Sequence, residues 1–161
     1  NKIKNIFTKV LKGHIAVATC NINKNNTGSK IDPMARKHLK MSGLDYAHGT
    51  GHGVGFFSNV HEGPQSISKF NKIILRKGMV LSNEPEGKFG IRIENLVFVN
   101  KNKNNLFFEN LTMAPIDKDL INLKLLNKKE KDYLLNYHLL VYSKISKYLS
   151  QQERKWLVRN I

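Results

Sequence analysis

Residues 45–55 read DYAHGTGHGVG, and residues 59–64 follow as NVHEGP. The two runs contain three histidines, His48, His52 and His61, and glycines alternate with other residues around the first two. Glycine lets a backbone approach another backbone or a ligand closely, and it is a poor helix former. A lone histidine is more often a structural residue than a ligand, but three of them among glycines indicate a site. We therefore predict a strand or loop here that carries functional imidazoles.

Two acidic motifs follow, Asn83-Glu84-Pro85 and then residues 90–95, which read GIRIEN. A carboxylate buried in an apolar strand without a partner costs several kcal/mol, so Glu94 needs a cation, a metal ion or exposure. Alternate residues of a strand face opposite sides, so Ile91 and Ile93 could be buried while Arg92 and Glu94 face water. Spacing alone leaves both interpretations open.

Two helices are predicted before the first segment, residues 45–55. Residues 3–18 carry an apolar stripe at spacings of three and four, which is typical of an amphipathic helix: Ile3, Ile6, Phe7, Val10, Leu11 and Val17. Residues 21–30 are polar and predict a loop. Asp32 followed by Pro33 then predicts an N-cap and a first helical turn, with the helix running to about Ser42 and ending at Gly43.

The middle of the chain predicts an antiparallel sheet, and the end predicts a helix. Residues 79–82, 91–99 and 106–111 are apolar and β-favouring, with a hairpin tip at 101–105. Beyond Pro115 a helical pattern returns, and Asn127 with Glu130 resembles a capping pair.

The amino-acid composition is typical of a globular protein. The 161 residues are 40% hydrophobic and 24% charged, which predicts one globular domain, and no apolar run suits a membrane-spanning helix. The net charge of +15 comes from a general excess of lysine, with asparagine, rather than from a basic patch, so we expect no nucleic-acid partner. The lone Cys20 predicts an apolar packing residue in a reducing compartment, and we expect a cytoplasmic protein.

The run HGTGHGVG, with NVHEGP, Glu84-Pro85 and GIRIEN in that order, closely resembles the Xaa-Pro aminopeptidases (aminopeptidase P), which are pita-bread metallopeptidases. Residues 11–16 (LKGHIA), Leu111-Thr112 with Pro115-Ile116, and 136–138 (NYH) resemble its cytosolic, eukaryotic-type branch. The resemblance implies an α+β fold, the C-terminal portion of a pita-bread fold with a curved antiparallel sheet packed by helices. Residues 1–115 would be the second part of the catalytic domain, and residues 116–161 a helical C-terminal extension.

The family consists of dinuclear metal hydrolases, usually with manganese, that release an N-terminal residue preceding proline. The resemblance assigns His52, Glu84 and Glu94 as metal ligands, with Glu94 bridging both ions, and cobalt or zinc would also suit them. Glu84 would also shuttle a proton. His61 would hydrogen-bond the substrate, His48 would line the site near the residue after the scissile bond, and Arg92 would orient the ligand carboxylates.

The chain departs from the family pattern in two places. The family takes two further ligands from aspartates that precede the first helix, and neither Asp32 nor Asp45 has that context. We therefore expect these 161 residues alone to bind metal weakly and to catalyse little. The second departure is that Glu86-Gly87-Lys88-Phe89 follows Pro85 at once, where the family usually has Gly-Tyr-Tyr and further residues.

Two other classes of function stay open from the sequence. A prolidase or a methionine aminopeptidase would share the site, whereas a non-catalytic pita-bread module would bind peptides, histones or RNA without metal. The retained His52, Glu84 and Glu94 count against the non-catalytic module, and the residues near Asn136–His138 favour aminopeptidase P. We expect peptides with proline in the second position as substrates and a homodimer formed through the C-terminal region. Its apolar residues could equally be ordinary core: Leu134, Leu135, Tyr137, Trp156 and Leu157.

Overall fold

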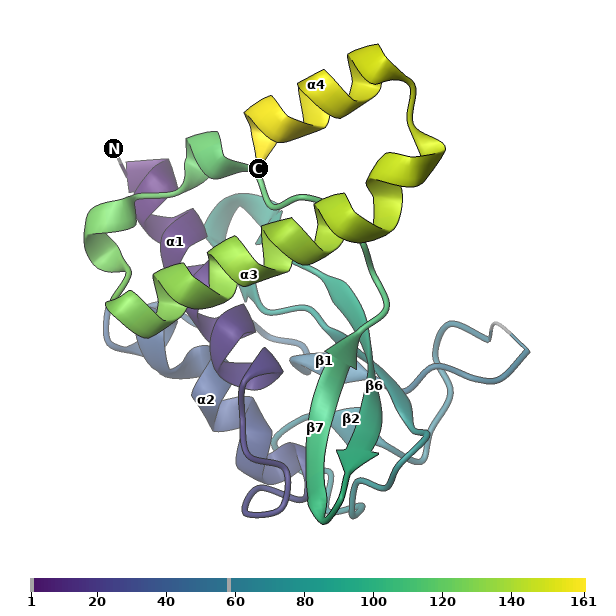
Figure 1. Ribbon diagram of the computed structural model, residues 1–161. Helices are drawn as coiled ribbons and strands as arrows, with labels where there is room; N and C mark the ends of the chain where they lie inside the picture. Colours follow the sequence, from purple (N-terminus) through teal and green to yellow (C-terminus); the bar gives the residue numbers. More distant parts are fainter. Residues whose placement is uncertain (1, 58) are drawn as a thin grey trace. The chain divides into compact units, whose positions relative to one another are not determined.

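The computed structural model describes residues 2–57 and 59–161 (Figure 1). The chain divides into two compact units. One consists of Asn1–Thr8 together with Met113–Ile161, and the other is Lys9–Thr112. The larger unit contains all the residues that were expected to carry chemistry: His48, His52, His61, Glu84, Arg92 and Glu94. Our boundary at residues 115 and 116 stays a prediction.

Two helices open the chain, α1 (Lys2–Ala18) and α2 (Gly28–Lys40). The first matches the helix expected from the apolar stripe. The second begins earlier than expected, so the prediction of an N-cap at Asp32 was wrong. The Thr27 carbonyl accepts the first helical hydrogen bonds, from Lys30 N at 3.1 Å and Ile31 N at 3.3 Å. Pro33 therefore lies inside the helix rather than at its start.

The end of α2 follows the expected chemistry. The helix stops at Lys40, and Gly43 adopts a left-handed backbone with φ of 68°, a conformation that costs other residues about 1–2 kcal/mol. The C-cap residue is Met41, and the N–H of Gly43 bonds to the Lys40 carbonyl at 3.0 Å. The predicted glycine stop is confirmed.

Within the described ranges, seven strands form three antiparallel sheets: β1 (Gly51–His52), β2 (Ser66–Ile67), β3 (Val80–Asn83), β4 (Glu86–Gly87), β5 (Ile91–Arg92), β6 (Asn95–Asn102) and β7 (Asn105–Asn110). β1 pairs with β2, β4 with β5, and β6 lies between β3 and β7. A bridge between Gly53 and Leu81 brings β1 beside β3. The α+β class with an antiparallel sheet is therefore confirmed.

The expected strand over residues 91–99 is divided in two. β5 pairs with β4 in a tight hairpin, in which Phe89 and Gly90 have φ of 70° and 69°, and β6 then pairs with β3. Ile93 and Glu94 lie between the two strands because the chain changes pairing partner there. The predicted hairpin tip is confirmed, since Asn102 pairs with Asn105 around Lys103.

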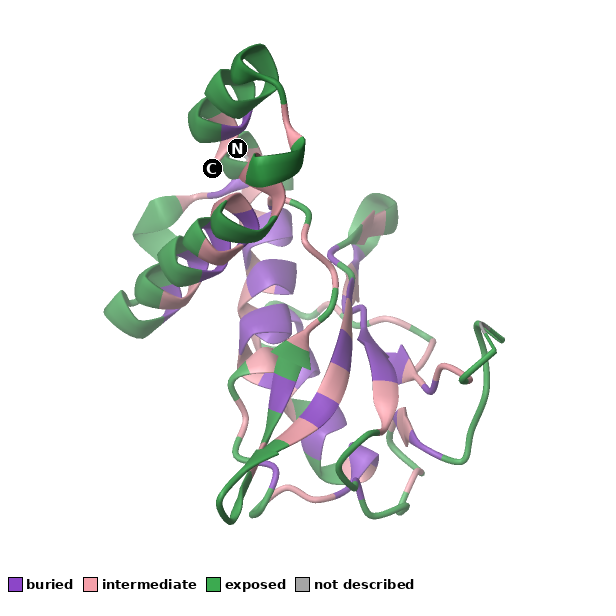
Figure 2. Cartoon of the chain, turned by 45° about the vertical axis from the view of Figure 1, so that its right-hand side comes forward, coloured by how far each residue is buried: buried purple, intermediate pink, exposed green. Residues whose placement is uncertain are grey.

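The core of the larger unit lies between its helices and the β3–β6–β7 sheet. Residues alternate between buried and partly buried along β6, as expected for a strand with one covered face (Figure 2). The buried set is Val17, Ile22, Ile31, Ala35, Ile67, Leu75, Leu81, Val97, Val99 and Phe108. Cys20 packs against it as expected, and burial raises the pKa of its thiol to about 12.

Gly51 allows the backbones of β1 and β3 to lie close together. A Cβ added there would lie 1.9 Å from the Ser82 carbonyl oxygen, so a side chain would force the strands apart. We expect Gly51→Ala to destabilise the full-length protein by about 3 kcal/mol or more, as overpacking against backbone does. Gly43→Ala is the comparison: nothing lies within 4 Å of its Cβ position, so its loss should be limited to the cost of a left-handed backbone, about 1–2 kcal/mol. Urea denaturation measures both, and an equal loss in the two variants would contradict the steric explanation.

The smaller unit contains α3 (Lys128–Ile145) and α4 (Gln151–Asn160), with short 3-10 turns at Lys118–Leu120, Leu123–Leu125 and Ser146–Tyr148. The Asn127–Glu130 capping pair is confirmed as a full capping box, and Ser150 with Glu153 forms a second one that the sequence analysis did not name. No helix within the described ranges is long and apolar enough to span a membrane.

Two α3 residues tie the segment before α3 to that helix. Tyr137 donates its hydroxyl to the Ala114 carbonyl at 2.7 Å, and His138 Nε2 accepts from the Ile116 N–H at 3.1 Å. The sequence left open whether the apolar residues of this region belong to the core, and in the structure only some of them are buried. Leu134, Tyr137 and Leu157 are buried, whereas Leu135 and Trp156 are exposed.

Candidate metal centre

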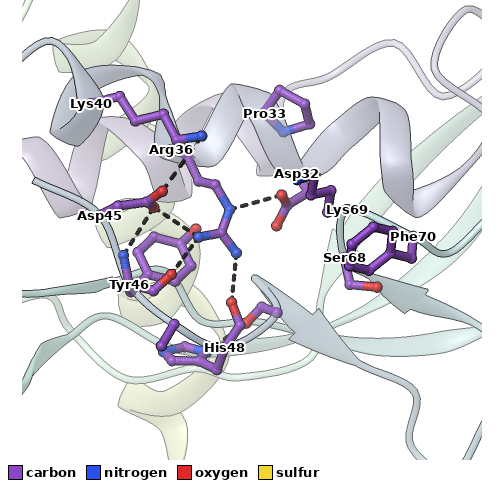
Figure 3. Close-up of a pocket in the computed structure, with 12 residues that line it drawn as sticks. Asp32, Pro33, Arg36, Lys40, Asp45, Tyr46, His48, Ser68, Lys69 and Phe70 are labelled. Carbon is purple, nitrogen blue, oxygen red and sulfur yellow. Dashed lines mark hydrogen bonds and ion pairs between the residues drawn. The ribbon is translucent and has the colours of Figure 1, made fainter.

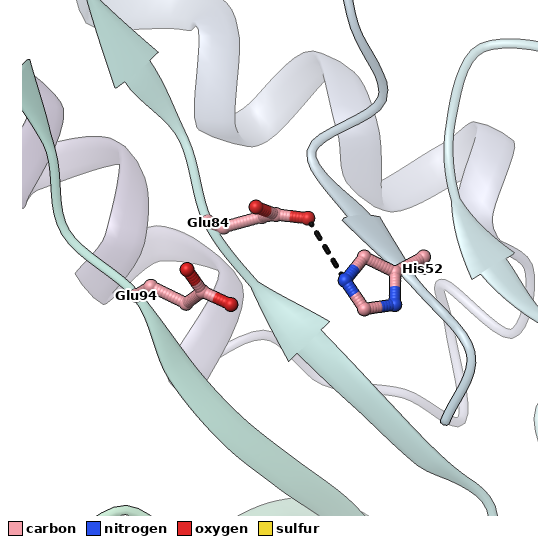
Figure 4. Close-up of side chains that lie close together, drawn as sticks. All are labelled: His52, Glu84 and Glu94. Atoms are coloured by element: carbon pink, nitrogen blue, oxygen red, sulfur yellow. Dashed lines mark ion pairs between the residues drawn. The ribbon is translucent and has the colours of Figure 1, made fainter. Parts of the chain in front are cut away.

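Three residues from separate segments of the larger unit converge at one point. His52 belongs to β1, Glu84 directly follows β3, and Glu94 lies between β5 and β6. One potential ligand atom from each lies within 4.8 Å of the others, and within the described ranges this is the group of three that could hold a metal ion (Figure 4). Glu84 is buried and Glu94 is exposed. The sequence left open whether Glu94 faces water or meets a cation, and in the structure it is exposed and also lies beside His52 and Glu84.

The tautomer of His52 follows from its neighbours. Its Nδ1 lies 3.0 Å from the Gly53 carbonyl oxygen, and because a carbonyl only accepts, Nδ1 carries the proton. In the neutral ring Nε2 then has a free lone pair, and it lies 3.3 Å from Glu84 Oε1. Two acceptors that face each other at this distance repel unless a proton or a cation lies between them.

The Glu84 carboxylate is held in a fixed orientation. Ser82 Oγ accepts from the His52 N–H at 2.8 Å and donates to Glu84 Oε1 at 3.1 Å. Arg92 Nη1 lies 3.2 Å from the other oxygen, Oε2, and the Glu84 N–H bonds to the Thr50 carbonyl at 2.8 Å. Only 7% of Glu84 is exposed, so these contacts set its position.

Glu86 is a charged residue of the site that the sequence analysis missed. Its Oε2 accepts from Arg92 Nε at 3.0 Å and lies 3.4 Å from His48 Nε2. The Arg92 guanidinium is the main reason that the pKa of Glu86 lies below its usual range. Glu86 and Arg92 are directly opposite in the β4–β5 pair, so a register for this hairpin would have predicted the contact.

The two other candidate histidines, His48 and His61, lie on either side of His52 in the sequence. His48 Nδ1 lies 2.6 Å from the Gly49 carbonyl, so its Nε2 faces Glu86. His61 is exposed in the loop after β1, and its ring centroid is 4.1 Å from that of His52. Glu84 therefore contacts His52 and Arg92 directly, and His61 contacts His52. His48 is connected to Glu84 through Glu86 and Arg92.

Arg36 binds the segment of residues 45–48, which leads to His52, through several hydrogen bonds (Figure 3). From α2 its guanidinium donates to Asp32 and to Asp45, each at 2.8 Å, and to the carbonyls of Tyr46 at 2.7 Å and His48 at 2.5 Å. Asp32 also accepts from the Thr50 hydroxyl at 2.7 Å. Both aspartates are therefore engaged in structural contacts, and the network fixes the path of the backbone that leads to His52.

A cavity of about 460 Å³ lies beside this network, between α2, residues 45–49 and residues 68–70. Lys40, Lys69 and the exposed Phe70 line it (Figure 3). Of the site residues named above, His48 also lines it, whereas His52, Glu84 and Glu94 do not. The cavity is thus separate from the cluster of ligand-type groups.

The sequence matches a known family over both parts of its length. Residues 1–101 match metallopeptidase family M24, and residues 104–161 match the C-terminal region of that peptidase family. The chain belongs to metallopeptidase family M24.

Relatives of this M24 chain include a probable Xaa-Pro aminopeptidase P of Laccaria bicolor, 48% identical over 173 residues. The match takes in 97% of this chain and 27% of the relative. A probable Xaa-Pro aminopeptidase P of Coprinopsis cinerea is 46% identical over 170 residues, with 95% and 27% covered. The chain therefore spans about a quarter of the length of these relatives.

Solved M24 structures confirm the fold. The X-prolyl aminopeptidase of Caenorhabditis elegans, described as a cytosolic enzyme with a di-nuclear active site, superposes with a TM-score of 0.89 at 36% identity. The superposition covers 99% of this chain and 28% of that one. A prolidase of Pyrococcus furiosus gives a TM-score of 0.58 at 28% identity over 70% of this chain and 33% of its own. The expected pita-bread fold is confirmed.

Proposed function

We propose that the protein containing this chain is a metal-dependent aminopeptidase that releases an N-terminal residue preceding proline. The observation that carries the proposal is the convergence of His52 Nε2 with the Glu84 and Glu94 carboxylates in an M24 chain. The match to an X-prolyl aminopeptidase over nearly the whole chain supports the same substrate class.

The three residues fit a divalent cation. The proton on His52 Nδ1 leaves Nε2 as a lone-pair donor, and the two carboxylates supply hard oxygen ligands and negative charge. A cation held by His52, Glu84 and Glu94 would supply Lewis-acid polarisation of a peptide carbonyl and would activate water at neutral pH. We propose two such ions, by analogy with the di-nuclear relative, and manganese as their identity.

The other side chains have roles around the scissile bond in this proposal. Glu84 accepts and returns a proton, with its carboxylate oriented by Ser82 and Arg92. His61, exposed and next to His52, donates a hydrogen bond to the substrate. His48, fixed by Gly49 and Glu86, lines the position of the residue after the scissile bond.

The C-terminal unit favours an aminopeptidase P over a prolidase or a methionine aminopeptidase. The X-prolyl aminopeptidase matches 99% of this chain, whereas the Pyrococcus prolidase matches 70%. The presence of His52, Glu84 and Glu94 together counts against a non-catalytic binding module, since such a module needs no metal ligands. We further propose a cytoplasmic homodimer in which the exposed Leu135 and Trp156 of the C-terminal unit take part.

Cleavage of matched peptides by the full-length protein tests the proposal. With manganese present, we expect release of arginine from Arg-Pro-Pro and at least a tenfold lower kcat/KM for Arg-Ala-Pro. This ratio corresponds to at least about 1.4 kcal/mol of transition-state discrimination. An Xaa-Pro dipeptide cleaved faster than the tripeptide would instead favour a prolidase. Absence of cleavage together with salt-sensitive binding of nonspecific RNA would favour the binding module.

A further inference from the structure

The cavity of about 460 Å³ beside α2 has no role in the proposed function (Figure 3). Its lining includes three basic side chains, Arg36, Lys40 and Lys69, and two acidic ones, Asp32 and Asp45. Arg36 hydrogen-bonds each aspartate at 2.8 Å, and Lys40 Nζ lies 3.5 Å from Asp45. The ammonium of Lys69 makes no ion pair within the described residues. Three positive and two negative groups leave one positive charge in excess, and Lys69 carries it.

Part of the cavity lining is held in place by contacts within the chain. The Arg36 guanidinium lies 3.9 Å from the centroid of the Tyr46 ring, and the Tyr46 and His48 ring centroids are 5.0 Å apart. Arg36 also donates to the His48 carbonyl at 2.5 Å. Lys69 and Phe70 are exposed, and 81% of Phe70 is accessible. The cavity thus combines a wall fixed by hydrogen bonds with an accessible ammonium and an accessible aromatic ring.

His48 connects the cavity to the proposed site of cleavage. Its side chain lines the cavity, and its Nε2 lies 3.4 Å from Glu86 Oε2. Glu86 and Glu84 both contact the Arg92 guanidinium. In the proposed function His48 lies by the residue after the scissile bond. The residues that follow in an extended peptide, at about 3.3 Å each, are therefore the ones that the cavity can take.

We propose that the cavity binds the third and later residues of a peptide substrate, and that Lys69 pairs with a carboxylate on them. The carboxylate is an acidic side chain or the C-terminus of a short peptide, since a lysine ammonium binds either one as a point charge. Phe70 supplies apolar contact to the same residues. The inference rests on the proposed function, because it assumes that the peptide is cleaved after its first residue.

Two pairs of peptides, each differing by one negative charge, test the inference on the full-length protein with manganese. One pair is Arg-Pro-Glu-amide and Arg-Pro-Gln-amide, and the other is Arg-Pro-Ala and its C-terminal amide. Steady-state kinetics measures kcat and KM for all four peptides. We expect the wild type to favour the acid of at least one pair about two- to fivefold in kcat/KM, through a lower KM, which is the range for an exposed charge pair. The pair that shows the preference identifies the source of the carboxylate.

Variants of Lys69 assign the preference to its ammonium. Lys69→Met should remove the preference, and Lys69→Arg should keep it because the positive charge remains. In the wild type the preference should weaken as salt is added, since an exposed charge pair is screened. Lys72→Met is the matched control, because Lys72 is exposed in the same segment between β2 and β3 and does not line the cavity. This control should keep the wild-type preference.

The possible failures are distinguishable. If the wild type cleaves all four peptides without preferring either acid, or if Lys69→Met keeps the preference, the inference is wrong and the proposed function stands. If the wild type cleaves none of the four peptides, the proposed function is overturned, and this inference with it.

Discussion

Glu84→Gln in the full-length protein is expected to lower kcat on an Xaa-Pro peptide by about 10²–10⁴-fold, the contribution typical of a general acid–base group. Glutamine keeps the shape of the side chain but removes its charge. It therefore weakens the contact with Arg92 Nη1 and removes an anionic ligand from the cluster. Manganese content should fall in parallel with the rate.

Glu109→Gln is the matched control for this prediction. Glu109 lies on β7, is exposed, and accepts a hydrogen bond from Asn100, away from the cluster. Its replacement should leave kcat and metal content unchanged. Steady-state kinetics and elemental analysis on the same samples measure both quantities. A Glu84→Gln variant that keeps wild-type activity and metal would remove Glu84 from the site.

Arg36→Met is expected to destabilise the full-length protein by about 3–5 kcal/mol, as loss of one partner of a buried ion pair does. The variant leaves Asp32, which is 2% exposed, without its cation in the interior. It also removes the guanidinium donors to the carbonyls of Tyr46 and His48, so the backbone before His52 loses the hydrogen bonds that fix it. We expect activity to fall as well at temperatures where the variant is folded.

Lys37→Met controls for the loss of a positive charge, because Lys37 is the next residue of α2 and is exposed. Urea denaturation should show a change of less than about 0.5 kcal/mol for this control. The double variant Asp32→Leu/Arg36→Met should be more stable than Arg36→Met alone, since it removes the stranded carboxylate. Equal stability of Arg36→Met and Lys37→Met would contradict the buried network.

Local chemistry explains which elements could be predicted. The α1 helix, the Gly43 stop, the hairpin around Lys103 and the Asn127 capping box each depend on residues a few positions apart. The predicted start of α2 was wrong because Asp32, although aspartate is a common N-cap residue, instead binds Arg36 and Thr50. The break at Ile93–Glu94 was missed because it depends on a change of pairing partner, from β4 to β3.

The residues of the candidate site could likewise be predicted only in part. The motif resemblance singled out His52, Glu84 and Glu94, although spacing alone left the exposure of Glu94 open. Glu86 and Ser82 were missed as site residues, because their contacts depend on hairpin register and on the approach of β1 to β3.

The metal content of the full-length protein tests most directly whether His52, Glu84 and Glu94 hold catalytic metal. We would measure bound manganese per chain after dialysis, alongside cleavage of Arg-Pro-Pro, in the wild type and in a His52→Ala/Glu84→Gln/Glu94→Gln variant. We predict about two ions per chain and cleavage in the wild type, with both lost in the variant. A folded wild type with neither metal nor cleavage, or a variant that keeps both, would contradict the claim.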